Sequence, residues 1–349
     1  MNDLALVAGD RFVLPRLLAQ ALSEHAGESL QIREHELPWP DEPFADVAEV
    51  SEACGSEEEI IEALREARVC LTQVAPITRR VLEACPRLEF VGVSRGGPVN
   101  VNLDASTDHG VLVSNAPGRN ATATAEFTIG LLLATLRRIC ETHASLSERR
   151  WEGEYYRYDE AGGELEHATV GVVGHGAVGG RVTRLLVAFG ARVLVYDPYV
   201  TVNCPGAAQV DTLVDLLEQA QVLTLHARAS EETAGMIDAR ALDALPDGSV
   251  LINAARGSLL DYDALFDALE SGRLAGAGLD VYPTEPVPGD SRLFSTRNLV
   301  MTPHVAGASR QVAHNAAAIV AREAGRFLAG SPLLHCRNSE AGKSPPPDP

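Results

Sequence analysis

The stretch that decides the fold runs from Thr169 to Asp197 and reads TVGVVGHGAVGGRVTRLLVAFGARVLVYD. A β-branched apolar run at 169–173 leads into a Gly-His-Gly-Ala-Val-Gly turn at 174–179. Apolar residues then recur at helical spacing, and a second apolar run at 192–196 ends at an acid. This order of strand, turn, helix, strand and acid predicts a βαβ unit that binds a dinucleotide, whereas a glycine turn alone also occurs in ordinary α/β domains.

Each glycine of the turn has a separate physical reason. Gly174 permits the tight turn after the strand, Gly176 lets the backbone approach a pyrophosphate, and Gly179 lets the helix pack close to the strand. The helix N-terminus then offers free N–H groups to the phosphates. Asp197 is placed to accept hydrogen bonds from the ribose diol and to repel a 2′-phosphate, so NAD is expected rather than NADP.

Length and composition indicate a two-domain globular protein. The chain has 349 residues, of which 46% are hydrophobic and 22% charged, and no apolar run is long enough to span a bilayer. The N-terminus lacks the features of a secretion signal, so a cytoplasmic location is expected. The six cysteines are scattered without a Cys-x-x-Cys pair, which indicates free thiols and neither a disulfide framework nor a metal site.

Charge excludes several classes of partner and mechanism. A formal net charge of −19 disfavours binding to nucleic acid or to an anionic membrane. Lys343 is the only lysine, and all other basic residues are arginines. Mechanisms that need a buried lysine, such as a Schiff base or a P-loop, are therefore excluded.

The pattern along the chain predicts two α/β domains with parallel sheets. The first is expected over 1–117 and 309–338, the second over 118–308, and 339–349 is expected to be a disordered tail. A single long helix is expected from about Ala123 to Arg149, and another from Ser309 to about Leu328. The expected strands are 4–8, 68–71, 88–93, 111–113, 169–173, 192–196, 222–225, 250–253, 277–281 and 299–301.

Three further segments carry chemistry, and each begins where a predicted strand ends. They contain Arg256 in Asn-Ala-Ala-Arg-Gly, Glu285 in Asp-Val-Tyr-Pro-Thr-Glu-Pro, and His304 in Thr-Pro-His-Val-Ala-Gly. Hydride exchange at a carbon beside a carboxylate needs a cation for that carboxylate, a proton donor near neutral pH, and an acid behind the donor. Arg256, His304 and Glu285 are the residues of the matching types.

With these motifs in this order and spacing, the chain closely resembles the NAD-dependent D-isomer-specific 2-hydroxyacid dehydrogenases, which include 3-phosphoglycerate dehydrogenases. The resemblance covers roughly residues 60–338 and implies catalytic residues Arg256, Glu285 and His304. It also implies a substrate domain, an NAD-binding domain, an active site in the cleft between them, and a homodimer formed partly through the long helix. The expected cofactor-binding residues are Gly174, Gly176, Ala177, Val178, Gly179, Asp197, His226, Ala254, Asp280 and Gly307, with Ala177 and Val178 at the pyrophosphate and Asp280 at the nicotinamide end.

Two places depart from the commonest pattern of that family. The segment after the strand at 222–225 reads His226-Ala227-Arg228 where His-x-Pro is usual, which weakens the prediction for His226. The predicted substrate loop contains Arg95, Gly96 and Gly97, where the two glycines can present N–H groups to a carboxylate. We expect Arg95 to meet a second anionic group on the substrate, although a surface position or an ion pair with a nearby acid explains it equally well.

The expected function is therefore an NAD-dependent oxidoreductase acting on a D-2-hydroxyacid or its 2-keto acid, with Arg256 also contacting the substrate. One alternative is a dimeric NAD(H)-sensing protein of the co-repressor kind. Another is formate or phosphite oxidation on the same scaffold, since a fold does not settle a reaction. A methyltransferase is more remote, because it gives the three later motifs no purpose.

Overall fold

The structure is a computed structural model that describes residues 3–26, 30–39 and 45–341. The chain divides into two compact units. Unit 1 comprises Met1–Asn120 and Ser309–Pro349, and unit 2 comprises Ala121–Ala308. The first boundary thus lies three residues beyond the position expected from the sequence, because the loop at 117–120 belongs with the strand that precedes it.

Unit 2 contains a seven-stranded parallel sheet with the strand order β10-β9-β8-β11-β12-β13-β14. The glycine turn follows β8, beside which the order reverses between β9 and β11. A reversal of this kind opens a crevice at the carboxyl ends of the strands, where open α/β sheets bind ligands. The strands are β8 (Thr169–Val173), β9 (Arg192–Tyr196), β10 (Ala207–Gln209), β11 (Val222–Leu225), β12 (Ser249–Asn253), β13 (Leu274–Leu279) and β14 (Leu299–Met301).

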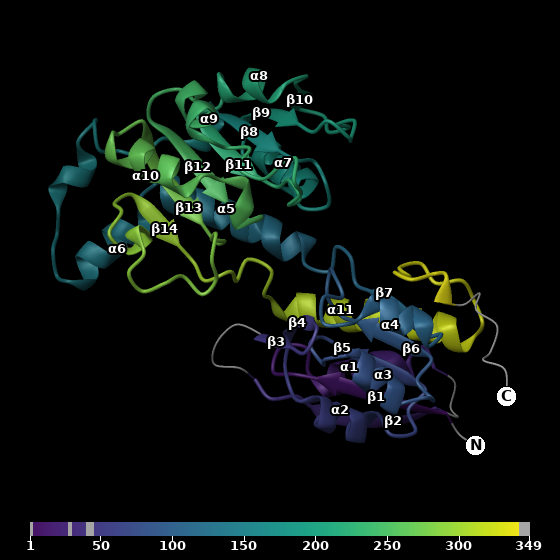
Figure 1. Ribbon diagram of the computed structural model, residues 1–349. Coiled ribbons are helices and arrows are strands. Elements are labelled where there is room, and N and C mark those ends of the chain that lie inside the picture. Colours follow the sequence, from purple (N-terminus) through teal and green to yellow (C-terminus); the bar gives the residue numbers. More distant parts are fainter. Residues whose placement is uncertain (1–2, 27–29, 40–44, 342–349) are drawn as a thin grey trace. The chain divides into compact units, whose positions relative to one another are not determined.

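Helices cover both faces of this sheet (Figure 1). One core lies beneath α5 (Ala121–Leu136) and α7 (Gly179–Ala188). The second core lies beneath α8 (Leu213–Leu217), α9 (Ala239–Ala244) and α10 (Tyr262–Glu270). Because both faces are buried, the strands are nearly continuous apolar runs rather than alternating ones.

Unit 1 has the same layered design on a five-stranded parallel sheet with the order β2-β1-β5-β6-β7. Its cores lie beneath α1 and α11 on one face and beneath α2, α3 and α4 on the other. The strands are β1 (Leu4–Gly9), β2 (Gln31–Glu36), β5 (Val69–Thr72), β6 (Phe90–Val93) and β7 (Leu112–Asn115), with a separate hairpin of β3 (Ala45–Val47) and β4 (Val50–Ala53). The helices are α1 (Pro15–Ser23), α2 (Glu57–Leu64), α3 (Arg79–Ala84), α4 (Leu103–Asp108) and α11 (Arg310–Leu328).

The prediction of two α/β domains with parallel sheets is confirmed. Unit 2 has the strand order of the dinucleotide-binding fold, and unit 1 has that of the flavodoxin-like fold. Short 3₁₀ turns complete unit 2: η1 (Gly153–Tyr156), η2 (Leu165–His167), η3 (Gly257–Leu259) and η4 (Arg292–Phe294).

The prediction of one long helix over 123–149 is wrong. The segment forms α5 and a separate helix, α6 (Ile139–Ser147), with a break at Arg138, whose φ is +52°. The Arg138 guanidinium holds this break through ion pairs with Glu141 and Glu160 and stacks over the ring of Tyr155 at 5.1 Å. Helical spacing continues across the break, so the sequence pattern does not reveal it.

The prediction that the tail from residue 339 is disordered is wrong for its first three residues. Ala341 is only 4% exposed, and its N–H donates to the carbonyl of Asn338. Asn338 in turn accepts from the Val113 N–H and donates to the Val111 carbonyl, so this segment is fixed along the edge of β7. Residues 342–349 lie outside the described part of the chain.

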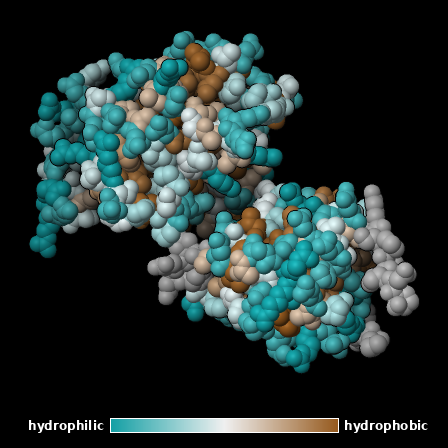
Figure 2. Space-filling model, viewed as in Figure 1, coloured by the Kyte–Doolittle hydropathy of each residue, from teal (hydrophilic) through white to brown (hydrophobic). Residues whose placement is uncertain are grey.

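The surface is mainly hydrophilic. Figure 2 shows hydrophilic side chains over most of the visible face of each unit, with smaller hydrophobic patches between them. Within residues 3–26, 30–39 and 45–341, no helix combines the length and apolar character needed to cross a membrane.

Candidate active site

The glycine turn after β8 has the geometry that its sequence predicts. Gly174 has φ +92°, and a Cβ there would lie 2.7 Å from the Ala227 backbone nitrogen. A Cβ on Gly179 would lie 1.9 Å from the Gly174 carbonyl oxygen, so only glycine allows α7 to start this close to the strand. Gly176 differs from both, since a Cβ there would meet nothing within 4 Å. The space beside Gly176 is therefore open to a ligand.

Unpaired N–H groups surround that space. The N–H groups of Gly176, Ala177 and Val178 make no hydrogen bond to any other described residue. Val178 is the N-cap of α7 and supplies no side-chain acceptor, so the helix begins with free donors and the positive end of its dipole. Three consecutive free N–H groups at a helix N-terminus form a site for a phosphate or pyrophosphate.

Asp197 is fixed at the end of β9 beside this turn. Its Oδ2 accepts the His175 N–H at 2.7 Å, and its Oδ1 accepts the N–H groups of Tyr199 and Val200 at 2.9 and 3.1 Å. The side chain thus ties the glycine turn to the neighbouring strand. Its predicted hydrogen bonds to a ribose stay a prediction.

His226 lies at the end of β11, packed beneath the turn. Its Nε2 is 3.0 Å from the Thr224 hydroxyl, and its buried Nδ1 has no hydrogen-bond partner within the described residues. Burial lowers the pKa of His226 to about 3, so the ring is neutral at physiological pH. A neutral, half-buried imidazole of this kind supports the turn, and a contact with the cofactor stays a prediction.

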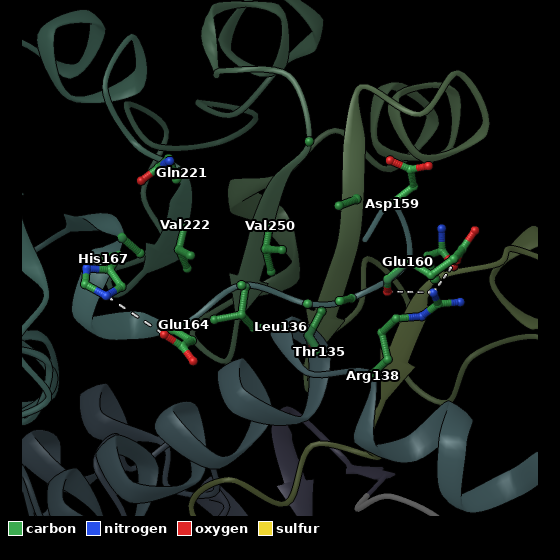
Figure 3. Close-up of a pocket in the computed structure, with 17 residues that line it drawn as sticks. Thr135, Leu136, Arg138, Asp159, Glu160, Glu164, His167, Gln221, Val222 and Val250 are labelled. Carbon is green, nitrogen blue, oxygen red and sulfur yellow. Dashed lines mark hydrogen bonds and ion pairs between the residues drawn. The ribbon is translucent and has the colours of Figure 1, made fainter. Parts of the chain in front are cut away.

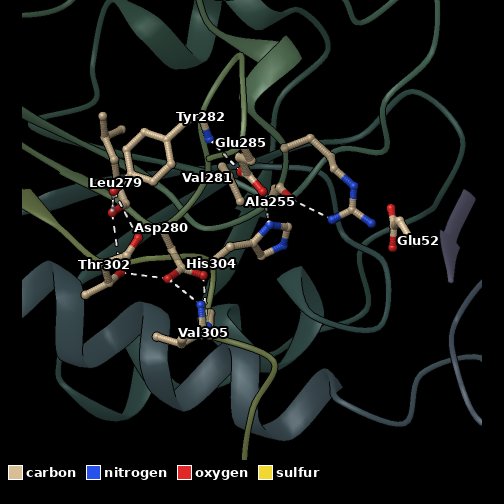
Figure 4. Close-up of polar contacts among 12 residues, drawn as sticks. Glu52, Ala255, Leu279, Asp280, Val281, Tyr282, Glu285, Thr302, His304 and Val305 are labelled. Carbon is tan, nitrogen blue, oxygen red and sulfur yellow. Dashed lines mark hydrogen bonds and ion pairs between the residues drawn. The ribbon is translucent and has the colours of Figure 1, made fainter. Parts of the chain in front are cut away.

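Asp280 organises the carboxyl end of the sheet. It is fully buried, and its two oxygens accept from the Thr302 hydroxyl at 2.7 Å and from the N–H groups of Val305 and Ala306 at 2.9 Å each (Figure 4). These bonds fix the loop after β14 on both sides of His304. In this conformation Asp280 is a positioning residue, and its predicted contact with a nicotinamide stays a prediction.

His304 and Glu285 are brought together although they belong to different loops. The His304 Nδ1 lies 2.6 Å from Glu285 Oε2, and Glu285 Oε1 accepts the Tyr282 N–H at 2.9 Å (Figure 4). His304 has φ +52°, a left-handed conformation that turns its ring toward Glu285. The His304 Nε2 makes no hydrogen bond within the described residues, and the side chain is 49% exposed, so this nitrogen is available to a ligand.

Their contact shifts the pKa values of His304 and Glu285 in opposite directions. The hydrogen bond to Glu285 raises the pKa of His304, against the opposing effects of burial and of the Arg256 charge. Burial alone would raise the pKa of Glu285, but the His304 hydrogen bond and the Tyr282 N–H outweigh it, so that pKa is lowered. The pair therefore favours an imidazolium beside a carboxylate.

Arg256 is held at the end of β12 by its neighbours. Asn253 is buried, donates to the Arg256 carbonyl at 2.9 Å and accepts the Ala255 N–H at 3.1 Å. The next residue is Gly257, where a Cβ would lie 2.0 Å from the Tyr282 carbonyl oxygen. The exposed Arg256 guanidinium donates to the Ala255 carbonyl and has no carboxylate partner within the described residues. Its charge is therefore free to meet an anion.

The remaining predicted residues fall at two separate places. Ala254 is buried at the end of β12, and Gly307 follows the Ala306 that Asp280 holds, so both lie on the carboxyl side of the unit 2 sheet. Arg95, Gly96 and Gly97 follow β6 in unit 1. The Asn115 amide donates to the Gly96 carbonyl at 2.6 Å, and Arg95 forms an ion pair with Glu52, so their contacts with a substrate stay predictions.

A cavity elsewhere in unit 2 is not part of this site. It has a volume of about 510 Å³ and lies at the amino ends of the strands, where Val222 and Val250 line it (Figure 3). Its charged lining is mostly acidic: Asp159, Glu160 and Glu164, with Arg138 already paired to Glu160. It faces away from the strand ends that carry the glycine turn and His304.

Sequence reasoning missed the residues that hold the site in place. Asn253 acts through hydrogen bonds to Ala255 and Arg256 within its own loop. Thr302 and the Tyr282 hydroxyl, which donates to the Thr302 carbonyl at 2.9 Å, act through contacts between loops about 20 residues apart in the sequence. Only their place in the sequence could have indicated these residues, because each lies at or just after the end of a strand, within the quoted motifs.

The comparisons with known proteins agree with this geometry. Residues 129–306 match the model of the NAD-binding domain of D-isomer-specific 2-hydroxyacid dehydrogenases. The chain is 36% identical to D-3-phosphoglycerate dehydrogenase of Mycobacterium leprae over 93% of its own length and 58% of that enzyme's, and so spans little more than half of that relative. It is 33% identical to glyoxylate reductase of Korarchaeum cryptofilum, covering 85% of this chain and 90% of the relative. The structure of D-2-hydroxyisocaproate dehydrogenase matches with a TM-score of 0.79 and 25% identity, covering 96% and 99% of the two chains.

NAD is thus the cofactor of unit 2, and the residues at its glycine turn fit it. The open space at Gly176, the three free N–H groups and the fixed carboxylate of Asp197 provide for a pyrophosphate and an unphosphorylated ribose.

The turn yields a prediction with opposite outcomes for two glycines. Gly179→Ala forces a methyl group against the Gly174 carbonyl and should lower the free energy of unfolding by about 1–3 kcal/mol in urea titrations. Gly176→Ala should change that free energy by less than about 0.5 kcal/mol. It should nevertheless raise the Kd for NADH about tenfold or more in fluorescence titrations, because the methyl group occupies pyrophosphate space.

Gly153→Ala is the control for the general effect of replacing glycine by alanine. Gly153 also has open space around it, but it lies in η1, outside the glycine turn. Unchanged NADH affinity in Gly176→Ala would contradict the assignment of this turn to the pyrophosphate.

Proposed function

Because the chain belongs to the D-isomer-specific 2-hydroxyacid dehydrogenase family, we propose that it is an NAD-dependent oxidoreductase that interconverts a D-2-hydroxyacid and its 2-keto acid. The observation that carries this proposal is the 2.6 Å contact between His304 and Glu285, with the other imidazole nitrogen free. With Glu285 on Nδ1, the free Nε2 of His304 can donate a proton to a substrate carbonyl oxygen or accept one from the corresponding hydroxyl.

In the direction of reduction, Arg256 holds the substrate carboxylate through paired N–H groups and polarises the adjacent carbonyl. His304 donates the proton on Nε2 to the carbonyl oxygen, which becomes the hydroxyl. Glu285 stabilises the imidazolium before transfer and keeps Nδ1 as the hydrogen-bonded nitrogen. NAD(H), when bound, supplies or accepts the hydride at the neighbouring carbon. Oxidation uses the same groups in reverse, with neutral His304 as the base.

We also propose that the chain forms a homodimer through the segment after α5. In Figure 1, α6 and the segment that follows it extend away from the seven-stranded sheet of unit 2. This segment exposes three aromatic side chains: Trp151 at 87%, Tyr156 at 94% and Tyr158 at 96%. Aromatic rings concentrated on one projecting segment mark a protein contact surface, and a second copy of unit 2 is the partner that the resemblance implies.

The first test of the proposed activity is an NADH-oxidation screen. Glyoxylate, hydroxypyruvate, oxaloacetate and 3-phosphohydroxypyruvate are offered as substrates, and at least one should be reduced. Arg256→Gln should lower kcat/KM by about 10²-fold or more, because it removes a paired contact to the carboxylate. An exposed arginine in the same unit, Arg240→Gln, is the control. NADH binding without turnover of any keto acid would favour a nucleotide-sensing protein instead.

The second test concerns pH. Since the pKa of His304 is raised, its proton is available below that pKa and is lost as the pH rises through it. Glu285→Gln removes the main cause of the shift, so the alkaline limb of the kcat/KM profile for reduction should move to lower pH. His304→Asn should lower kcat about 10²- to 10⁴-fold. Asp290→Asn, which removes an exposed carboxylate from the same loop, should leave the profile in place; an unmoved profile in Glu285→Gln would refute the pairing.

The third test concerns assembly. In sedimentation experiments the chain should have about twice the mass of its 37.1 kDa monomer. A Trp151→Glu, Tyr158→Glu double variant should sediment as a monomer, because a carboxylate in place of each ring would have to be buried in the interface without a partner. Val214→Glu on α8 alters another exposed hydrophobic residue and should leave the mass unchanged. A monomeric wild-type chain would exclude the dimer.

A further inference from the structure

The carboxyl end of the sheet in unit 1 gathers polar side chains from four loops. Asp10 follows β1, Gln73 follows β5, Arg95 follows β6, and Arg119 lies in the loop after β7. The carboxyl ends of parallel strands share one edge, which is where such sheets hold ligands. These loops carry three arginines: Arg11 is exposed, whereas Arg95 and Arg119 are partly buried although the chain has a net charge of −19.

Arg119 is positioned by neutral groups. Its Nη1 donates to the Gln73 side-chain oxygen at 3.3 Å, and its guanidinium lies over the Phe12 ring at 5.9 Å from the centroid. The loop that carries Phe12 is fixed by Asp10, whose Oδ1 accepts the Phe12 N–H at 2.7 Å and the Val13 N–H at 2.8 Å. An aromatic face and an amide oxygen orient a guanidinium without neutralising it.

Arg119 has no carboxylate partner within the described residues. Asp10 does not serve as one, because its other oxygen, Oδ2, is buried and makes no hydrogen bond. Most of the five N–H donors of the Arg119 fork are therefore uncommitted, in the planar arrangement that matches a phosphate or carboxylate. Arg95 contrasts with this, because it is paired with Glu52 and also donates to the Glu52 carbonyl at 3.2 Å.

Electrostatics at this edge favour the arrival of an anion. Burial is the main cause that lowers the pKa of Arg119 to about 10, and the positive charge of Arg95 adds to it, partly offset by Asp10. A cation that has lost hydration and stands near a second cation gains more from an anionic ligand than a solvated surface arginine does.

We propose that Arg119 recognises a second anionic group on the substrate, a phosphate or a distal carboxylate, and so sets the specificity of the enzyme for dianionic 2-keto acids. This inference rests on the proposed function, in which Arg256 takes the carboxylate beside the reacting carbon. A dianionic substrate then needs another cation, and Arg119 is a partly buried guanidinium at this edge of unit 1 that has no carboxylate partner among the described residues. Arg95, already paired, is the weaker candidate of the two.

The experiment compares three substrates in Arg119→Gln, Arg95→Gln and Arg16→Gln. Glyoxylate has one anionic group, whereas oxaloacetate and 3-phosphohydroxypyruvate have a second carboxylate and a phosphate. Arg119→Gln should lower kcat/KM for one of the dianions about 10- to 100-fold, mainly through KM, and change that for glyoxylate less than about threefold. Whichever dianion shows the loss identifies the second group. Arg119→Lys, which keeps the charge without the fork, should fall between wild type and Arg119→Gln.

Arg16→Gln removes an exposed charge from α1 and should affect all substrates equally little. Equal losses for glyoxylate and the dianions in Arg119→Gln, a larger loss in Arg95→Gln, or a wild-type preference for glyoxylate over both dianions would overturn the proposal. Circular dichroism of each variant shows whether it is folded, and Arg119→Lys keeps the comparison possible if Arg119→Gln is not.

Calorimetric titration of the NADH-saturated protein with inorganic phosphate gives a readout that is independent of turnover, because bound NADH occupies the phosphate site at the glycine turn. Wild type and Arg256→Gln should bind phosphate, and Arg119→Gln should bind it at least tenfold more weakly. If no keto acid is reduced, the proposed function fails while this titration still decides the inference about Arg119. Phosphate binding that is unchanged in Arg119→Gln would refute it.

Discussion

The buried carboxylate of Asp280 holds the loop that carries His304 against the end of β13. A carboxylate with no solvent exposure is costly unless donors satisfy it, and here the Thr302 hydroxyl and two backbone N–H groups do so. Hydrogen bonds to a charged group contribute about 1.5–3 kcal/mol each, enough to fix the loop in one conformation. That conformation places His304 with φ +52° and its Nδ1 on Glu285. The proton-transfer geometry of His304 therefore depends on Asp280, whose carboxylate already accepts three hydrogen bonds within the protein.

Backbone fit at the sheet edge imposes a second constraint on the same region. Gly179 must be glycine because α7 starts against the Gly174 carbonyl, and Gly257 must be glycine because the Arg256 loop approaches the Tyr282 carbonyl. A Cβ on either Gly179 or Gly257 would clash with a backbone carbonyl, whereas Gly176 borders open space. Gly179 and Gly257 are therefore needed for backbone packing at the sheet edge, whereas Gly176 leaves room for a ligand. The sequence motif alone does not distinguish these two reasons for a glycine.

The sequence predicts what depends on local pattern and fails where distant contacts decide. The apolar runs predict buried strands such as 222–225 and 250–253, and their alternation with helical segments predicts both parallel sheets. The break at Arg138 was missed because no glycine or proline marks it; Arg138 has φ +52°, and its guanidinium pairs with Glu141 and Glu160. Strand β2 was missed because its QIREHE sequence is polar and mostly exposed, and pairing with β1 decides its conformation. For the site, the residue types of Arg256, Glu285 and His304 were readable, but the bonds of Asn253 and Asp280 that position them were not.

Arginine shows most clearly why residue type alone is insufficient. Eleven of the 28 arginines form an ion pair with a carboxylate of the described residues, and such pairs are common surface features of little energetic consequence. An arginine that meets none, while a neutral acceptor or an aromatic ring fixes its position, keeps its charge for a ligand. Arg256 and Arg119 meet this condition, and Arg95 does not, because Glu52, 43 residues earlier in the chain, lies beside it. Since tertiary structure alone brings Glu52 to Arg95, the sequence favours Arg95, next to its glycines, whereas the structure points to Arg119.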